Sequence, residues 1–186
     1  MTYNKEASNV IETLKTTLGN DEFQDKILNI ATLIEKINKE GKITAIFGNG
    51  GSAADAQHFA AELVCTYKDR NRKPFKAIAL TTDTSIMTAW ANDFEYETIF
   101  TRQLNAFENY IGLSIGMSTS GKSKNVLKAL QYSKQIKSTT CLICGNNDLN
   151  YENIDFVIKV PSKDTGTIQT VTQVIYHSIC QALENQ

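Results

Sequence analysis

The stretch ITAIFGNGGS, residues 43–52, decides the fold, because a short apolar run passes directly into a turn rich in glycine. The run 43–47 is typical of a buried strand, and a helical pattern starts at residue 53 and continues to residue 67. A strand, a glycine-rich turn and a helix in this order form the first half of a βαβ unit. We therefore expect a parallel sheet.

The same alternation continues to the end of the chain, after two helices (5–17 and 21–40) that precede the first strand. Strands alternating with helices imply parallel pairing through right-handed crossovers. We expect an α/β fold, a doubly wound sheet of about five parallel strands with helices on both faces. It would form one domain over 1–186, with a helical N-terminal segment (1–40) and an α/β core (41–186). The further strands are expected at 77–80, 111–117, 140–144 and 156–160, and the further helices at 84–91, 96–108, 122–135 and 165–184.

Composition excludes some classes of partner. The 186 residues include 19 basic and 20 acidic ones, for a net charge of −1, without the basic excess of a nucleic-acid binder. No stretch approaches the roughly 20 apolar residues of a membrane helix, and the first residues lack the apolar region of a signal peptide. We expect a cytoplasmic protein that binds neither nucleic acid nor membrane.

Cys141 and Cys144 form a C-x-x-C motif, which raises the question of a metal or redox site. Both lie in an expected strand, where side chains three apart point to opposite faces. We interpret them, with Cys65 and Cys180, as free thiols.

Two turns are suited to an anionic ligand, and both follow strands. In residues 48–52, glycines expose backbone N–H groups, and Ser52 is placed to cap the next helix. Residues 116–123, GMSTSGKS, match the Walker A pattern. An NTPase is disfavoured because the loop follows the third strand and no later strand ends in the Asp that would hold magnesium. The hydroxyls and N–H groups of the second turn suit one phosphate ester.

Four motifs in register resemble those of the sedoheptulose 7-phosphate isomerases (phosphoheptose isomerases), within the sugar isomerase (SIS) domain superfamily. They are GNGGS (48–52), HFAAEL (58–63), ANDF (91–94) and STSGKS (118–123). The resemblance covers essentially the whole chain and implies a flavodoxin-like SIS fold. It also implies a homotetramer that converts sedoheptulose 7-phosphate to D-glycero-D-manno-heptose 7-phosphate for lipopolysaccharide or capsule.

The same resemblance implies the site residues. The phosphate would be held by Ser118, Thr119, Ser120 and Ser123. The rest of the substrate would be lined by Asn49, Gly50, Gly51, Ser52, Glu62, Asn92, Asp93 and Gln169. One zinc ion per subunit would be bound by His58, Glu62, Gln169 and His177.

Spacing supports part of this metal set independently. His58 and Glu62 are four residues apart, and Gln169, Gln173 and His177 follow one another at intervals of four, so each set shares a helix face. The chain has only these two histidines. Two imidazoles, a carboxylate and an amide oxygen suit zinc, although glutamine is an unusual ligand. A site in which Glu62 and His177 act without zinc is the alternative.

For the chemistry we expect Glu62 to move a proton between C1 and C2 through an enediol, with His177 as acid or electrophile. The chain departs from the family at Thr66, Thr167 and Thr170, where many relatives carry Arg, Arg and Glu. The loss of positive side chains near the site would shift its preference among sugar hydroxyl patterns or phosphates. The rivals are a non-catalytic SIS-domain regulator that binds a replication initiator and another SIS-type isomerase. The presence of both Glu62 and His177 favours an enzyme.

Overall fold

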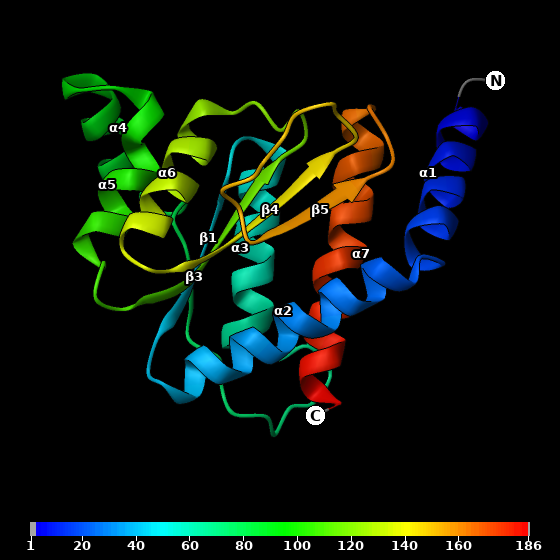
Figure 1. The fold of residues 1–186 in the computed structure, drawn as a ribbon, viewed down its shortest axis with the longest axis horizontal. Helices are drawn as coiled ribbons and strands as arrows, with labels where there is room; N and C mark the ends of the chain where they lie inside the picture. The colour runs from blue at the N-terminus through cyan, green and yellow to red at the C-terminus, as the bar shows by residue number, and fades with distance from the viewer. Residues whose placement is uncertain (1–2, 186) are drawn as a thin grey trace.

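The structure, a computed structural model, describes residues 3–185, so residues 1, 2 and 186 of the expected domain lie outside it. Two helices lead into an α/β arrangement (Figure 1). The strands are β1 (Ile43–Gly48), β2 (Ala77–Ala79), β3 (Ile111–Ser118), β4 (Thr139–Gly145) and β5 (Phe156–Val160). The helices are α1 (Tyr3–Leu18), α2 (Asp21–Lys39), α3 (Gly51–Val64), α4 (Thr84–Asp93), the 3₁₀ helix η1 (Tyr96–Thr98), α5 (Ile99–Ala106), α6 (Lys124–Gln135) and α7 (Thr165–Glu184).

The five strands form one sheet in the order β2-β1-β3-β4-β5, and every pair is parallel. The prediction of a doubly wound α/β sheet with two leading helices is confirmed. Its order reverses between β1 and β3, and in such sheets ligands bind beyond the carboxyl ends of the strands at that point. The register pairs Gly48 with Met117, so the turns that follow β1 and β3 leave the sheet side by side.

Helices cover both faces of the sheet (Figure 1). One buried apolar cluster joins the strands to α2, α3 and α7, and a second joins them to α5 and α6. Strand side chains alternate between the clusters, as Ile46 and Phe47 do in β1. Cys141 belongs to the first cluster and Cys144 to the second, so the two thiols point to opposite faces as expected.

The leading helices differ in how much they bury. In α2, Asn20 is the N-cap as expected, and its side chain accepts a hydrogen bond from the Phe23 N–H at 3.3 Å. A stripe of apolar side chains on α2 is buried against the sheet and α7. Helix α1 packs beside α7 (Figure 1) and leaves Ile11 51% exposed and Leu18 39% exposed.

Helix α3 runs from Gly51 to Val64 rather than over the expected 53–67. At its end the guanidinium of Arg72 donates to the carbonyls of Glu62 and Leu63 at 2.7 and 3.1 Å. These carbonyls are among the last of the helix, which lack partners within it. Arg72 thus satisfies carbonyls that a longer helix would have bonded, and the chain turns away after Val64.

The expected helix 96–108 is also divided. Its first residues form η1, and α5 begins only at Ile99. The Trp90 indole N–H donates to the Thr98 hydroxyl at 2.9 Å, which fixes this tighter turn against α4.

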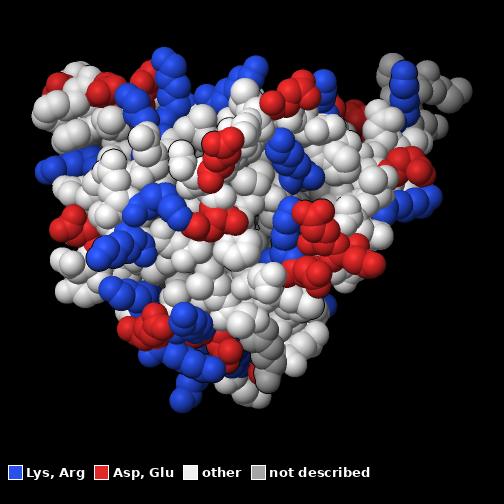
Figure 2. All heavy atoms as spheres, in the orientation of Figure 1, with Lys and Arg blue, Asp and Glu red and all other residues white. Residues whose placement is uncertain are grey.

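Charges are mixed over the face shown in Figure 2, where basic and acidic side chains are interspersed. Lys128, for example, lies 3.1 Å from Glu95 and 2.8 Å from Glu97. Between residues 3 and 185, none of the helices has both the length and the apolar character needed to cross a bilayer.

Candidate active site

The turn after β1 depends on Gly50. Gly50 has a φ of +57° and is the N-cap of α3, a backbone conformation that costs glycine little. The helix therefore begins one residue before Ser52, which is buried in its first turn. The expectation that Ser52 caps α3 is wrong, because the glycine starts the helix earlier.

Asn49 joins this turn to the helix that follows the second turn. The side-chain Nδ2 of Asn49 donates to Asn125 Oδ1 at 2.9 Å, and Asn49 Oδ1 accepts from Asn125 Nδ2 at 2.8 Å. The Tyr96 hydroxyl donates to the same Asn49 oxygen at 2.9 Å. The sequence analysis does not identify Asn125 or Tyr96. The one sequence signal for them is that Tyr96 follows the motif at 91–94 and Asn125 follows the motif at 118–123.

The turn after β3 is organised by its own hydroxyls. Ser118 Oγ donates to Ser123 Oγ at 2.9 Å, and the Lys122 N–H donates to Ser120 Oγ at 3.1 Å. A hollow of about 350 Å³ opens beside it, lined by Thr119, Ser120, Lys122, Asn146, Asn147, Asp148, Leu149 and Lys163. Of the four residues expected to hold the phosphate, Thr119 and Ser120 line this hollow, and Ser118 and Ser123 do not. Two lysines and the carboxylate of Asp148 line it as well.

Asn92 and Asp93 lie at the exposed end of α4, where the Asn92 amide donates to the Asp93 carboxylate at 2.8 Å. Tyr96, three residues beyond Asp93, is the side chain from this segment that reaches Asn49.

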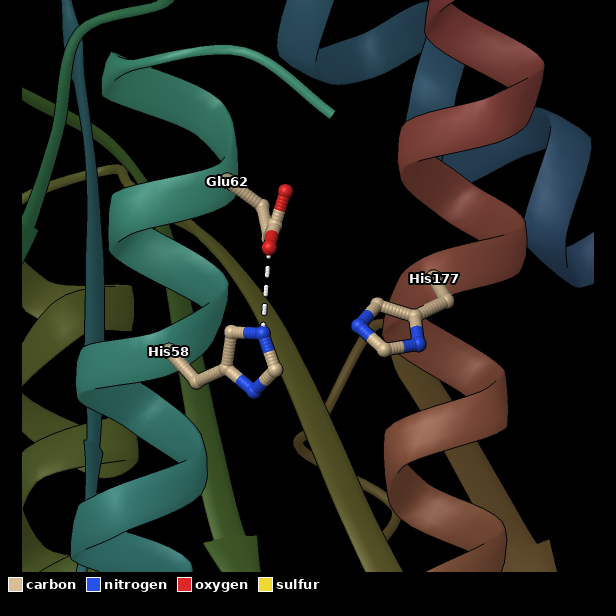
Figure 3. A group of neighbouring side chains, drawn as sticks. All are labelled: His58, Glu62 and His177. Carbon is tan, nitrogen blue, oxygen red and sulfur yellow. Dashed lines mark hydrogen bonds and ion pairs between the residues drawn. The ribbon is translucent and has the colours of Figure 1, made fainter. Parts of the chain in front are cut away.

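Helices α3 and α7 bring His58, Glu62 and His177 together (Figure 3). His58 and Glu62 come from successive turns of α3, and His177 points toward them from α7. His58 Nε2 lies 3.0 Å from Glu62 Oε1, and one ligand atom from each of the three residues lies within 4.8 Å of the others. The prediction that two helices far apart in sequence bring Glu62 and His177 together therefore holds in the structure.

The three side chains fit a zinc ion by donor chemistry. Two imidazole nitrogens and one carboxylate oxygen form a common catalytic zinc set that leaves a position open for substrate. The pKa of His177 is lowered, first by burial and then by the neighbouring His58. An imidazole with a lowered pKa is neutral at pH 7, the form that binds a metal.

Gln169 lies apart from this group. It packs against the start of α3, so closely that a Cβ on Gly51 would be 2.8 Å from Gln169 Cδ. Eight residues along α7 separate it from His177, about 12 Å at the usual helical rise. Within one chain the structure gathers three of the four expected metal ligands and places Gln169 beside the turn after β1.

A buried network behind His58 was missed by sequence reasoning. The Tyr176 hydroxyl lies 2.9 Å from His58 Nδ1. Asp55, only 6% exposed, has Gln173 and Tyr176 as neighbours. Burial raises the pKa of Asp55, and these neighbours and the charge of His58 oppose the rise. The one sequence signal for Asp55 is that it lies three residues before His58, a spacing that places both on one face of a helix.

A second hollow opens at His177. It measures about 710 Å³ and is bordered by α1, α2, α7 and the segment after α3, including Leu18, Leu28, Tyr67 and Lys68. The residues that line it are different from those that line the hollow at the phosphate turn. Of the three clustered side chains, His177 lines this hollow, whereas His58 and Glu62 do not.

Comparison with known proteins gives a consistent family. The family model described as "SIS domain" matches residues 2–145. The phosphoheptose isomerase of Helicobacter pylori strain P12 is 46% identical over 84% of this chain and 81% of its own length. That of Clostridium acetobutylicum is 38% identical over 95% and 90%.

Solved structures agree over the full length. A phosphoheptose isomerase from Francisella tularensis superposes with a TM-score of 0.88 at 25% identity, covering 100% of this chain and 97% of its own. One from Neisseria gonorrhoeae superposes with a TM-score of 0.81 at 28% identity, covering 100% of both chains. From motif, fold and these likenesses together, the chain belongs to the phosphoheptose isomerase family of SIS-domain proteins.

Proposed function

We propose that this chain interconverts sedoheptulose 7-phosphate and D-glycero-D-manno-heptose 7-phosphate, a step of bacterial heptose biosynthesis. The observation that carries the proposal is the meeting of Glu62 with His58 and His177 in a member of this family. A non-catalytic regulator has no need of a carboxylate and two imidazoles so close together.

The substrate has two distinct ends, because its phosphate is on C7 and its reacting carbons are C1 and C2. We assign the phosphate to Ser118, Thr119, Ser120 and Ser123. The turn after β1 (Asn49, Gly50, Gly51 and Ser52), with Asn92, Asp93 and Gln169, lines the sugar. Lys68 contributes to lowering the pKa of His177, so a positive charge lies near the site although Thr66 replaces the arginine of many relatives.

Glu62 is the proposed base. Its carboxylate takes one proton from C1 of the ketose and returns it to C2 of the enediol, which gives the aldose. His177 gives a proton to O2 as the carbonyl becomes a hydroxyl, and recovers one from O1 as the new carbonyl forms. The Glu62 side chain is 20% exposed, so water reaches the proton while Glu62 holds it.

We further propose that His58, Glu62 and His177 bind one zinc ion per subunit, in which case Glu62 and His177 transfer protons while coordinated or after ligand exchange. A bound zinc would polarise the substrate carbonyl as a Lewis acid. Gln169 stays a predicted fourth ligand, and its place beside Gly51 supports a substrate-binding role more directly.

We propose a cytoplasmic homotetramer. Several large apolar side chains are exposed on one chain, among them Leu28 at 53%, Val64 at 43% and Phe94 at 64%. These side chains are available to contacts between subunits. A neighbouring copy over the hollow at His177 would also close the site around the reacting carbons, and native mass spectrometry tests the tetramer directly.

The function is tested by incubating the purified protein with sedoheptulose 7-phosphate and following the heptose 7-phosphate by NMR, with arabinose and hexulose phosphates in parallel. We expect turnover of the heptulose phosphate, loss of activity with a chelator, and recovery with zinc. Turnover of another sugar phosphate alone would reassign the substrate. A protein that converts none of them would be a binding module.

A further inference from the structure

Three consecutive backbone carbonyls of the turn after β3 each accept a hydrogen bond from the segment 145–151, which leads from the end of β4 toward β5. The carbonyls belong to Thr119, Ser120 and Gly121, and their donors are, in the same order, the Gly145 N–H at 3.0 Å, the Asn147 side-chain amide at 3.3 Å and the Tyr151 hydroxyl at 3.1 Å. The turn that we assign to the phosphate therefore has these carbonyls directed toward the segment 145–151.

Asn147 uses every hydrogen-bonding group of its side chain. Besides the Ser120 carbonyl, its Nδ2 donates to the Gly145 carbonyl at 3.1 Å. Its Oδ1 accepts the Leu149 N–H at 3.0 Å and lies 3.1 Å from the Tyr151 hydroxyl oxygen. With the amide flipped, its oxygen would face two carbonyls and its nitrogen would face an N–H group. The neighbours of Asn147 therefore fix its donor side toward the turn.

Tyr151 has a single hydroxyl proton and two acceptors at 3.1 Å, the Gly121 carbonyl and Asn147 Oδ1. Because the Leu149 N–H already bonds Asn147 Oδ1, the proton is available to the Gly121 carbonyl. The two segments approach closely at this point, since a β-carbon on Gly121, whose φ is +68°, would overlap the Tyr151 oxygen. The hydroxyl thus reaches the backbone of the turn directly.

The segment that carries these donors is itself held by the sheet. The Lys159 ammonium, on β5, donates to the carbonyls of Asn147 and Leu149 at 3.0 and 3.1 Å. The same ammonium lies 5.5 Å from the centre of the Tyr151 ring, which packs against the apolar cluster that joins the sheet to α5 and α6. Asn147 and Tyr151 are therefore anchored by groups outside the phosphate turn, so they are able to set the position of that turn.

The direction of the carbonyls matters because of the charge of the ligand. A carbonyl oxygen carries partial negative charge and repels a phosphate that it faces, whereas hydroxyls and N–H groups bind one. Both kinds of group meet at Ser120. Its carbonyl is bonded by Asn147, and its hydroxyl, which accepts the Lys122 N–H at 3.1 Å, is one of the four groups assigned to the phosphate.

We propose that Asn147 and Tyr151 are positioning residues for phosphate binding, which hold the carbonyls of Ser120 and Gly121 away from the anion and thereby present the Ser120 hydroxyl to it. The proposal rests on the proposed function for the place of the phosphate. Both residues act through the turn. The phosphate is on C7, away from the reacting carbons C1 and C2, so loss of either side chain weakens binding and spares proton transfer.

Steady-state kinetics of N147A and Y151F with sedoheptulose 7-phosphate tests the proposal. Each variant removes a neutral hydrogen-bond donor to the turn and adds no charge. We expect KM to rise about 3- to 10-fold, the effect of one such hydrogen bond, with kcat within about two-fold of wild type. An unchanged KM in both variants would overturn the proposal, and so would a fall in kcat at an unchanged KM.

Matched controls lie in the same segment and on the same residue type. N150A removes an amide that bonds Glu152 within the segment, and Y132F removes a hydroxyl that bonds Glu108. Both should keep the KM of wild type. Thermal unfolding of each variant checks that the fold is kept, and Y151F, which removes one oxygen atom, is the milder of the two test variants.

A double-mutant cycle separates positioning from a direct contact between Asn147 and the phosphate. In N147A the Ser120 hydroxyl is already displaced, so we expect S120A to raise KM by a smaller factor in N147A than in wild type. Equal factors in the two backgrounds would show that Asn147 acts independently of Ser120, and they would overturn the proposal.

The affinity for inorganic phosphate, measured by titration calorimetry, requires no turnover and separates this proposal from the proposed function. A protein that converts no heptulose phosphate, but whose affinity for inorganic phosphate falls about 3- to 10-fold in N147A and Y151F, would refute the proposed reaction and support the positioning role. A protein that isomerises the heptulose phosphate, with one phosphate affinity in wild type and both variants, would refute the positioning role and leave the reaction standing.

Discussion

The ring of Tyr67 stacks on the ring of His177, with centroids 5.2 Å apart and planes inclined by 27°. Tyr67 belongs to the segment that follows α3, and this segment is held by Glu184 at the end of α7. Glu184 accepts the backbone N–H groups of Tyr67, Lys68 and Asp69 at 2.9 to 3.2 Å. Glu184 lies two turns after His177 on α7. Its carboxylate thus holds the Tyr67 ring in place beside His177.

Glu184→Gln should destabilise the protein by about 2–3 kcal/mol, because Glu184 is nearly fully buried and its loss leaves the charge of Arg72 unpaired. Burial alone would raise the pKa of Glu184, but the three backbone N–H groups and Arg72 outweigh it and lower the pKa below 4.5. The stabilisation is therefore present above pH 4.5 and is lost as the pH falls through the folded-state value.

Urea unfolding from pH 7 to pH 3 measures both parts of this prediction. The difference in unfolding free energy between wild type and variant should be constant above about pH 5 and shrink below it. The control is Glu12→Gln, which removes an exposed ion pair with Lys15 and should cost less than about 0.5 kcal/mol. A difference that grows in acid would contradict the assignment.

Glu62→Gln keeps the size of the side chain and removes the base. We expect kcat to fall by about 100-fold or more with KM nearly unchanged, because the loss acts on proton transfer rather than on phosphate binding. Steady-state kinetics with sedoheptulose 7-phosphate measures it, with Glu40→Gln on the far end of α2 as the control. Near-normal turnover would remove Glu62 from the mechanism.

Ser120→Ala removes one hydroxyl from the turn after β3. We expect KM to rise about 10-fold with a small change in kcat, since one hydrogen bond to a charged group contributes about 1.5 kcal/mol. Ser85→Ala, an exposed hydroxyl on α4, serves as the control. A Ser120→Ala variant with the KM of wild type would show that the phosphate binds elsewhere.

Gly51→Ala tests the contact between α3 and α7 at the turn after β1. The added methyl would overlap the end of the flexible Gln169 side chain, which can shift, and we expect a loss of no more than about 1 kcal/mol in stability. Gln169→Ala in the same chain should recover most of it, because it removes the overlapping atoms. Additive losses in this double-mutant cycle would mean that the two residues do not compete for the same space.

Local pattern was sufficient for the sheet and for much of the site. Strand and helix periods set the order of elements along the chain, whereas the spatial order of the strands, with its switch point between β1 and β3, is seen only in the structure. His58 and Glu62 share a face through spacing alone. Their meeting with His177 was predicted only with help from the family resemblance.

The remaining parts depend on pairs that no local pattern reveals. Tyr176 and His58 are 118 residues apart, and Asn49 and Asn125 are 76 apart. The end of α3 at Val64 depends on Arg72, which folds back onto carbonyls of an earlier turn. Each of these contacts forms only when the tertiary structure brings the partners together.

The proton path is the central claim, and isomerisation in D₂O tests it most directly. We predict deuterium at C2 of the heptose 7-phosphate formed by the wild type, detected by NMR or mass spectrometry, because Glu62 is 20% exposed and exchanges its proton with solvent. A Glu62→Gln variant that forms the C2-deuterated product at the wild-type rate would show that another group carries the proton, and it would contradict Glu62 as the base.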